Sequence, residues 1–207
     1  RIPVVFLMTI TSHSHFNTGT LTAIVLLVLV ASSCSSDSAM VRDQLDPVTS
    51  VTISYSQTPM VFYRDVSGRA AYARNFVHMA PLEVNRSGDY RYYLWLGIWN
   101  TMADAESDQS RDGFESIVIF ADGEPLPLEI AGWTVAAIGA SKPVYIKPVA
   151  SAADAYYAVT VDQLRLIAEA RDVRLKTTGS RNESYEPWDN QKSAKKSLIE
   201  FLGRSVY

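Results

Sequence analysis

Apolar and polar residues alternate along much of this chain with the period of two that a β-strand produces. Successive side chains of a strand point to opposite faces, so this alternation predicts strands that are buried on one face. It is clearest at Val51, Ile53 and Tyr55, which are separated by Thr or Ser. The same pattern, or a short apolar run between turn residues, predicts strands over residues 49–56, 60–66, 71–79, 90–99, 114–121, 126–130, 133–138, 144–149, 156–160 and 172–177.

Two segments have a helical period instead. Residues 162–170 place Leu164, Ile167 and Ala168 on one face, with Thr160 or Asp162 available as the N-cap. Residues 189–204 form a second amphipathic segment with lysines on the polar face. Many short strands and few helices predict a mostly β (α+β) fold, an antiparallel β-sandwich or barrel-like sheet with two short helices, the second C-terminal.

The N-terminal part of the chain has a different pattern. Residues 21–30 form an unbroken apolar run, which is followed by Ala31-Ser32-Ser33 and by Cys34, the only cysteine. The run is shorter than the roughly 20 apolar residues that span a bilayer. The segment resembles the signal peptide and lipobox of bacterial lipoproteins. This resemblance implies cleavage before Cys34 and acylation of its thiol, which then anchors the protein to a membrane.

Two other interpretations of this segment stay open. Ala31 and Ser33 also fit ordinary signal cleavage, which would leave a secreted protein without a lipid, and an uncleaved anchor is the third possibility. The predicted organisation is a signal peptide over 1–33, a lipid-anchored tether over 34–47 and a single β-rich domain over 48–207. By the same resemblance, Ser35 directs the protein to the periplasmic face of the outer membrane in a Gram-negative bacterium.

Composition narrows the chemistry further. The net charge of −3 comes without clustered basic residues, so no nucleic-acid partner is expected. A single cysteine allows no disulfide within one chain. The 11 tyrosines and four tryptophans predict an aromatic-rich core.

Candidate catalytic and metal-binding residues are few. His13 and His15 precede the predicted cleavage point, which leaves His78 as the only histidine and favours a structural role for it. The acidic loop over 104–115 places acids as a calcium-binding EF-hand loop does, but Gln109 replaces the required glycine, so a solvated loop is favoured over a cation site. Neither a metal nor a cofactor is expected. Paired carboxylates for glycoside chemistry are not singled out by spacing among four candidates, Glu83, Asp89, Glu115 and Glu129.

The strand over 90–99 is apolar on both faces, so both faces must be covered. The favoured interpretation is a central strand packed on both sides. The alternative leaves Tyr93, Trp95 and Trp99 open as a platform for a sugar ring or a peptide, with Gly97 allowing the ligand close to the backbone.

These observations favour a non-catalytic, membrane-anchored envelope lipoprotein that binds another envelope protein or has a structural, accessory role. One alternative is a protein that binds or hydrolyses peptidoglycan with the aromatic strand. The other is a secreted periplasmic protein without a lipid.

Overall fold

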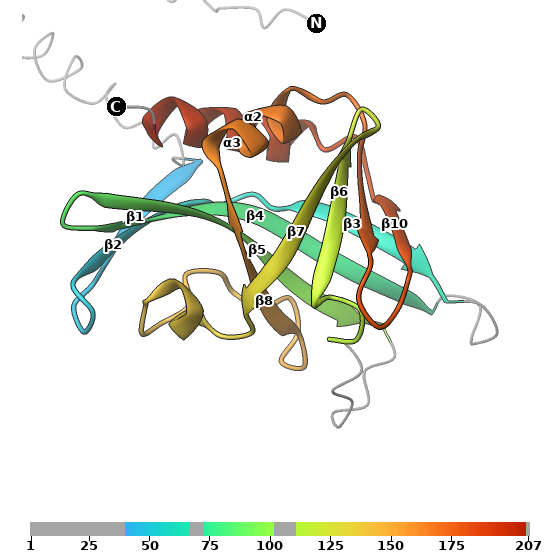
Figure 1. The fold of residues 1–207 in the computed structure, drawn as a ribbon, viewed down its shortest axis with the longest axis horizontal. Helices are drawn as coiled ribbons and strands as arrows, with labels where there is room; N and C mark the ends of the chain where they lie inside the picture. The colour runs from blue at the N-terminus through green and yellow to red at the C-terminus, as the bar shows by residue number, and fades with distance from the viewer. Residues whose placement is uncertain (1–39, 67–72, 102–110, 206–207) are drawn as a thin grey trace, which may run out of the picture. The chain divides into compact units, whose positions relative to one another are not determined.

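The computed structural model describes residues 40–66, 73–101 and 111–205. These residues form ten β-strands, one short 3-10 helix and two α-helices (Figure 1). The strands are β1 (Val41–Asp46), β2 (Val51–Ser56), β3 (Met60–Asp65), β4 (Arg74–Arg86), β5 (Asp89–Asn100), β6 (Ser116–Ala121), β7 (Glu124–Gly132), β8 (Ala153–Val159), β9 (Val173–Thr177) and β10 (Ser184–Pro187). The helical elements are η2 (Val135–Ile138), α2 (Val161–Glu169) and α3 (Lys192–Ser205).

Eight of the strands in this part of the chain close into an antiparallel barrel. Their order around the barrel is β3, β4, β5, β8, β7, β6, β9 and β10, and β10 pairs with β3 to close it. The predicted mostly β fold, with an antiparallel barrel-like sheet and two helices, is therefore confirmed. The Asp122-Gly123 turn joins β6 to β7, with positive φ at both residues (50° and 89°), as a two-residue hairpin of this type requires.

Strands β1 and β2 extend the sheet beyond the barrel from β4. Residues 74–79 of β4 pair with β3, whereas residues 82–85 pair with β2. Pro81 lies between the two pairings, where its missing N–H removes no hydrogen bond from either. β4 therefore belongs both to the barrel and to the extension.

The barrel interior is filled by side chains, many of them aromatic. Inward-facing residues of β3, β5 and β8, among them Phe62, Leu96 and Tyr157, are fully buried in one hydrophobic cluster. Most of the largest fully buried side chains are aromatic, which confirms the predicted aromatic-rich core.

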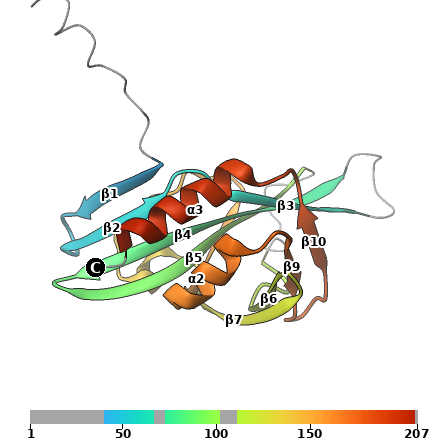
Figure 2. The same ribbon diagram turned by 90° about the horizontal axis from the view of Figure 1, so that it is seen from above.

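Helices α2 and α3 lie together beside the barrel and contribute apolar side chains to this cluster (Figures 1 and 2). Thr160 caps α2 through a reciprocal capping box with Gln163, as one of the two predicted N-caps. Lys195 of α3 donates from Nζ to the backbone oxygens of Ala170 and Arg171, at the end of α2, which ties the helices to each other. Neither helix of the described residues is long and apolar enough to cross a membrane.

A second, smaller core lies on the outer face of β2, β4, β5 and β8. The segment over 133–152 covers this face and packs Ile138 and Tyr145 against Leu82, Trp95 and their neighbours. The segment contains η2 and bends but no strand, so the strands predicted over 133–138 and 144–149 are wrong. Its apolar residues cover a sheet from outside instead of joining one.

Asp46, at the end of β1, fixes this segment to the sheet. Its carboxylate accepts hydrogen bonds from the backbone N–H and the Oγ–H of Ser141, the second at 2.8 Å, and from the Val48 N–H at 3.0 Å. The hydrogen bond from the Ser141 N–H is the main reason why the pKa of Asp46 is well below its usual value.

Two strands lie where none was predicted. β1 falls within residues 34–47, so the tether prediction is wrong for Val41–Asp46. β10 falls between the strand predicted over 172–177 and the helix predicted over 189–204, and α3 begins at Lys192, three residues after the predicted start. Trp188, between β10 and α3, is 47% exposed.

Candidate binding site at the mouth of the barrel

Tyr93 and Trp95, two of the three residues suggested as an open platform, are buried on the outer face of β5. Trp95 is 1% exposed; its ring stacks on Tyr145 with centroids 4.4 Å apart, and its Nε1–H donates to Asp154 Oδ1 at 2.9 Å. Tyr93 packs in the same outer core. The platform prediction is therefore wrong for both residues, and the interpretation of β5 as a central strand covered on both faces holds.

Gly97 also differs from its suggested role. A Cβ at this position would lie 2.6 Å from Cη2 and 2.7 Å from Cζ2 of Trp95. The space above Gly97 is therefore occupied by the indole of the same strand, so Gly97 is needed for internal packing and leaves no access for a ligand.

Trp99, the third platform residue, belongs to an outer aromatic row made of Tyr63, Phe76, Trp99 and Trp188. Trp99 stacks on Phe76 at 4.6 Å, and Phe76 and Tyr63 each contact Trp188 edge-on, at 5.3 and 5.2 Å. Trp99 is half-buried, and Trp188 is the most exposed of the four. Arg74 lies over the Trp188 ring at 5.1 Å.

His78 points outward from β4 beside this row, with its ring edge-on to Trp99 at 6.1 Å. Burial lowers its pKa and so favours the neutral imidazole. Its aromatic surroundings fit the structural role that the sequence favoured.

A cavity of about 120 Å³ lies at one end of the barrel, where β3 and β5 end and where β4 and β10 begin. We call this end the mouth. Its polar walls continue the inward period of the strands: Arg64 follows Met60 and Phe62 on β3, and Asn100 follows Leu96 and Ile98 on β5. The inward positions thus change from apolar to polar at the strand ends.

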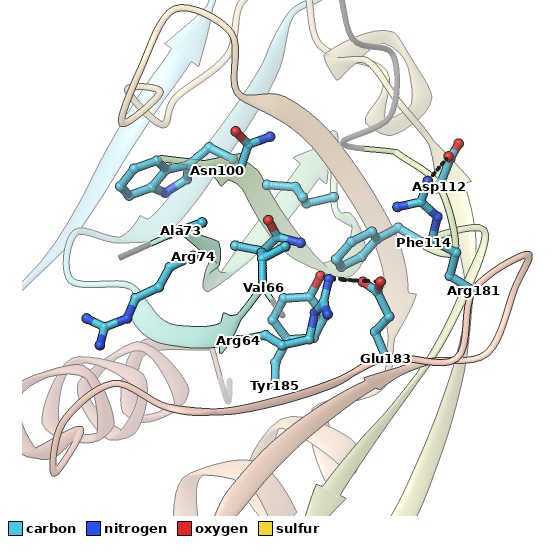
Figure 3. Close-up of a pocket in the computed structure, with 13 residues that line it drawn as sticks. Arg64, Val66, Ala73, Arg74, Asn100, Asp112, Phe114, Arg181, Glu183 and Tyr185 are labelled. Atoms are coloured by element: carbon cyan, nitrogen blue, oxygen red, sulfur yellow. Dashed lines mark hydrogen bonds and ion pairs between the residues drawn. The ribbon is translucent and has the colours of Figure 1, made fainter. Parts of the chain in front are cut away.

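Arg64, Glu183 and Tyr185 form one connected group in the mouth (Figure 3). Arg64 Nη2 lies 2.8 Å from Glu183 Oε1, and the Tyr185 hydroxyl donates to Glu183 Oε2 at 3.2 Å. Burial, with a smaller contribution from Glu183, raises the pKa of Tyr185 to about 12, so its hydroxyl keeps its proton near neutral pH. Arg64 Nε is buried and has no hydrogen-bond acceptor among the described residues.

A second ion pair stands at the rim of the mouth. Arg181 Nη2 lies 2.9 Å from Asp112 Oδ2 (Figure 3). The β9–β10 turn that carries Arg181 and Glu183 is held by the buried hydroxyl of Thr177, which donates to the Arg181 backbone oxygen and accepts from the Glu183 N–H, both at 2.9 Å. One side chain therefore fixes the backbone of both charged residues of the turn.

Several predicted site residues lie outside the mouth or outside the residues that the structure describes. Cys34 and most of the acidic loop over 104–115 lie outside the described residues. Of the described end of that loop, Asp112 is paired with Arg181. Within residues 40–66, 73–101 and 111–205, no group of three or more His, Cys, Asp or Glu side chains is placed to hold a metal ion.

Of the charged mouth residues, only Asp112 belonged to a candidate from the sequence, the acidic loop over 104–115. The charged residues come from the end of β3, the start of β4, the turn before β6 and the β9–β10 turn, and only Arg64 is marked by a polar residue at an inward position of a strand end. Comparison of the chain with protein-family models, with curated proteins and with solved structures finds no match. The fold and the site define a small antiparallel β-barrel with a filled interior and a polar cavity at its mouth.

Proposed function

We propose that this chain is an exported lipoprotein of the bacterial envelope, anchored through acylated Cys34, that acts by binding another envelope component and not by catalysis. The observation that carries the proposal is the apolar run over 21–30 followed by small residues and the only cysteine. Its proposed location is the periplasmic face of the outer membrane.

The start of β1 limits how far such an anchor would let the folded domain lie from the membrane. Seven residue steps separate Cys34 from Val41, and at full extension they reach about 25 Å. Within this proposal, the start of β1 stays within that distance of the lipid surface, which keeps the domain close to the membrane. Its binding partner is then expected at the membrane, as for an accessory component of an envelope assembly.

The mouth supports binding over catalysis. Its carboxylates, Glu183 and Asp112, are both engaged by arginines, and Tyr185 keeps its proton. Groups of this kind orient and recognise a polar ligand, whereas general acid–base chemistry needs a pKa near the working pH.

Peptidoglycan remains a second candidate ligand because aromatic side chains are accessible outside the buried strand face. Trp188 is 47% exposed and adjoins Tyr63 and Phe76 in the outer aromatic row. A surface of this composition could contact a sugar ring, although Trp95 and Tyr93 take no part in it.

Fractionation of cells that express the full chain tests the anchor. The wild-type protein should be found in the membrane fraction and carry lipid, and Cys34→Ser should be soluble in the periplasm; Ser36→Ala, which keeps the thiol, is the matched control. A soluble wild-type protein would favour ordinary secretion, and membrane retention of Cys34→Ser would favour an uncleaved anchor. Either result would overturn the lipoprotein proposal.

In-cell crosslinking followed by mass spectrometry tests the binding role, with and without muramidase digestion. A discrete protein attached in both samples supports an accessory role. Attachment that disappears after digestion supports peptidoglycan as the ligand. A crosslinking pattern equal to that of an unrelated lipoprotein control would contradict a specific binding role.

A further inference from the structure

We propose that the mouth of the barrel binds a small carboxylate group, with Arg64 as its principal contact. The inference deepens the binding role proposed above, because it names the site and the ligand chemistry. It does not depend on the lipid anchor.

The hydrogen-bonding capacity of the mouth favours an anion. Two arginines that line the cavity, Arg64 and Arg181, are each paired with one carboxylate, Glu183 and Asp112 respectively. Arg74 also lines the cavity, but it pairs with Asp65 and lies over the Trp188 ring of the outer aromatic row. Each guanidinium offers several N–H donors and no acceptor, so the cavity has more donors than its own carboxylates use. A ligand that supplies acceptors and negative charge complements this wall.

Arg64 is placed to make the contact. Glu183 pairs with one of the terminal nitrogens of Arg64, and Tyr185 donates a hydrogen bond to Glu183. These two residues therefore fix the position of the Arg64 guanidinium. The buried Nε–H of Arg64 has no acceptor among the described residues, and a buried donor that stays unpaired destabilises the fold. A small turn of Arg64 would offer Nε–H to a ligand oxygen, and the planar guanidinium matches the two oxygens of a carboxylate.

The size of the cavity restricts the ligand. Pockets for drug-sized molecules measure about 300–1,000 Å³, whereas this one holds about 120 Å³. The mouth therefore accepts a small acid or the end of a longer chain, such as the C-terminal carboxylate of a peptide. Each arginine of the lining already has a carboxylate partner, so the mouth suits a monoanionic carboxylate better than a phosphate dianion.

Calorimetric titration of the purified full chain in non-ionic detergent tests the proposal. The probes are acetate, tri-alanine with a free C-terminus, tri-alanine amide and inorganic phosphate. We expect saturable binding of at least one free carboxylate and weaker binding of phosphate. Binding of the tripeptide acid without acetate would identify a chain end, and binding of acetate as well would identify small acids.

Arg64→Met should weaken carboxylate binding at least tenfold, whereas Arg165→Met, at an exposed ion pair on α2, should leave it unchanged. If Arg64→Met unfolds because Glu183 is left unpaired, the double variant Arg64→Met/Glu183→Gln removes both charges, and its fold is checked by circular dichroism. Absence of saturable carboxylate binding, tighter binding of phosphate, or unchanged affinity in a folded Arg64 variant would overturn the proposal. Membrane fractionation of Cys34→Ser is independent of these titrations, so the two proposals fail separately.

Discussion

Gly97→Ala would place a methyl group where the indole ring of Trp95 already lies. The added Cβ would sit 2.6 Å from Cη2 of that ring, whereas carbon atoms in contact prefer about 3.5–4.0 Å. The ring would have to move by about 1 Å. Tyr145 stacks on it at 4.4 Å and Asp154 holds its Nε1–H, so the movement is resisted from two sides.

The magnitude follows from two opposing effects. Overpacking of a filled core costs about 1–3 kcal/mol. Replacing glycine by alanine within a strand returns about 0.5–1 kcal/mol, because the unfolded chain loses freedom. We therefore expect Gly97→Ala to lower the free energy of unfolding by about 1–2 kcal/mol.

Urea unfolding followed by far-UV circular dichroism measures this effect in two backgrounds. In Trp95→Leu no ring covers Gly97, so adding Gly97→Ala should be neutral or slightly stabilising, and the double-mutant cycle should give a coupling of about 2 kcal/mol. Gly203→Ala on α3, where no atom lies within 4 Å of the new Cβ, is the matched control and should not destabilise. An equal cost of Gly97→Ala in both backgrounds would refute the packing argument.

Three further predictions concern single side chains. Thr160→Ala removes the acceptor for the Gln163 N–H and should lower the free energy of unfolding by about 1 kcal/mol in urea titrations. Asp46→Asn should destabilise at pH 7, and the difference from wild type should shrink as pH falls below about 4, because the lowered pKa of Asp46 makes its contribution present above the unfolded value and lost on protonation. Trp99→Ala should cost less than the roughly 3–5 kcal/mol expected for a fully buried tryptophan, because Trp99 is half-buried; an equal or larger loss would contradict this.

The strand pattern predicted most of the sheet, since alternation at residues such as Val51 and Ile53 depends only on which face is buried. The same signal failed over 133–149, where short apolar runs suggested strands. Val144 and Tyr145 are apolar because they cover the outer face of β4 and β5, and coverage of this kind leaves no distinct period. β10 was missed because it has only four residues and because its pairing with β3, through Tyr63, joins segments far apart in the sequence.

The two apolar faces of β5 and the polar mouth show which sequence features indicate a binding site in this fold. A strand that is apolar on both sides must be covered, and here the chain covers Trp95 itself with the segment that carries Tyr145. A polar residue at an inward position is different, because burial without partners is costly and the cavity stays open around it. Arg64, two residues beyond Phe62 on the same face of β3, is such a residue. We therefore expect ligand-contacting residues where the inward series of a strand changes from apolar to polar.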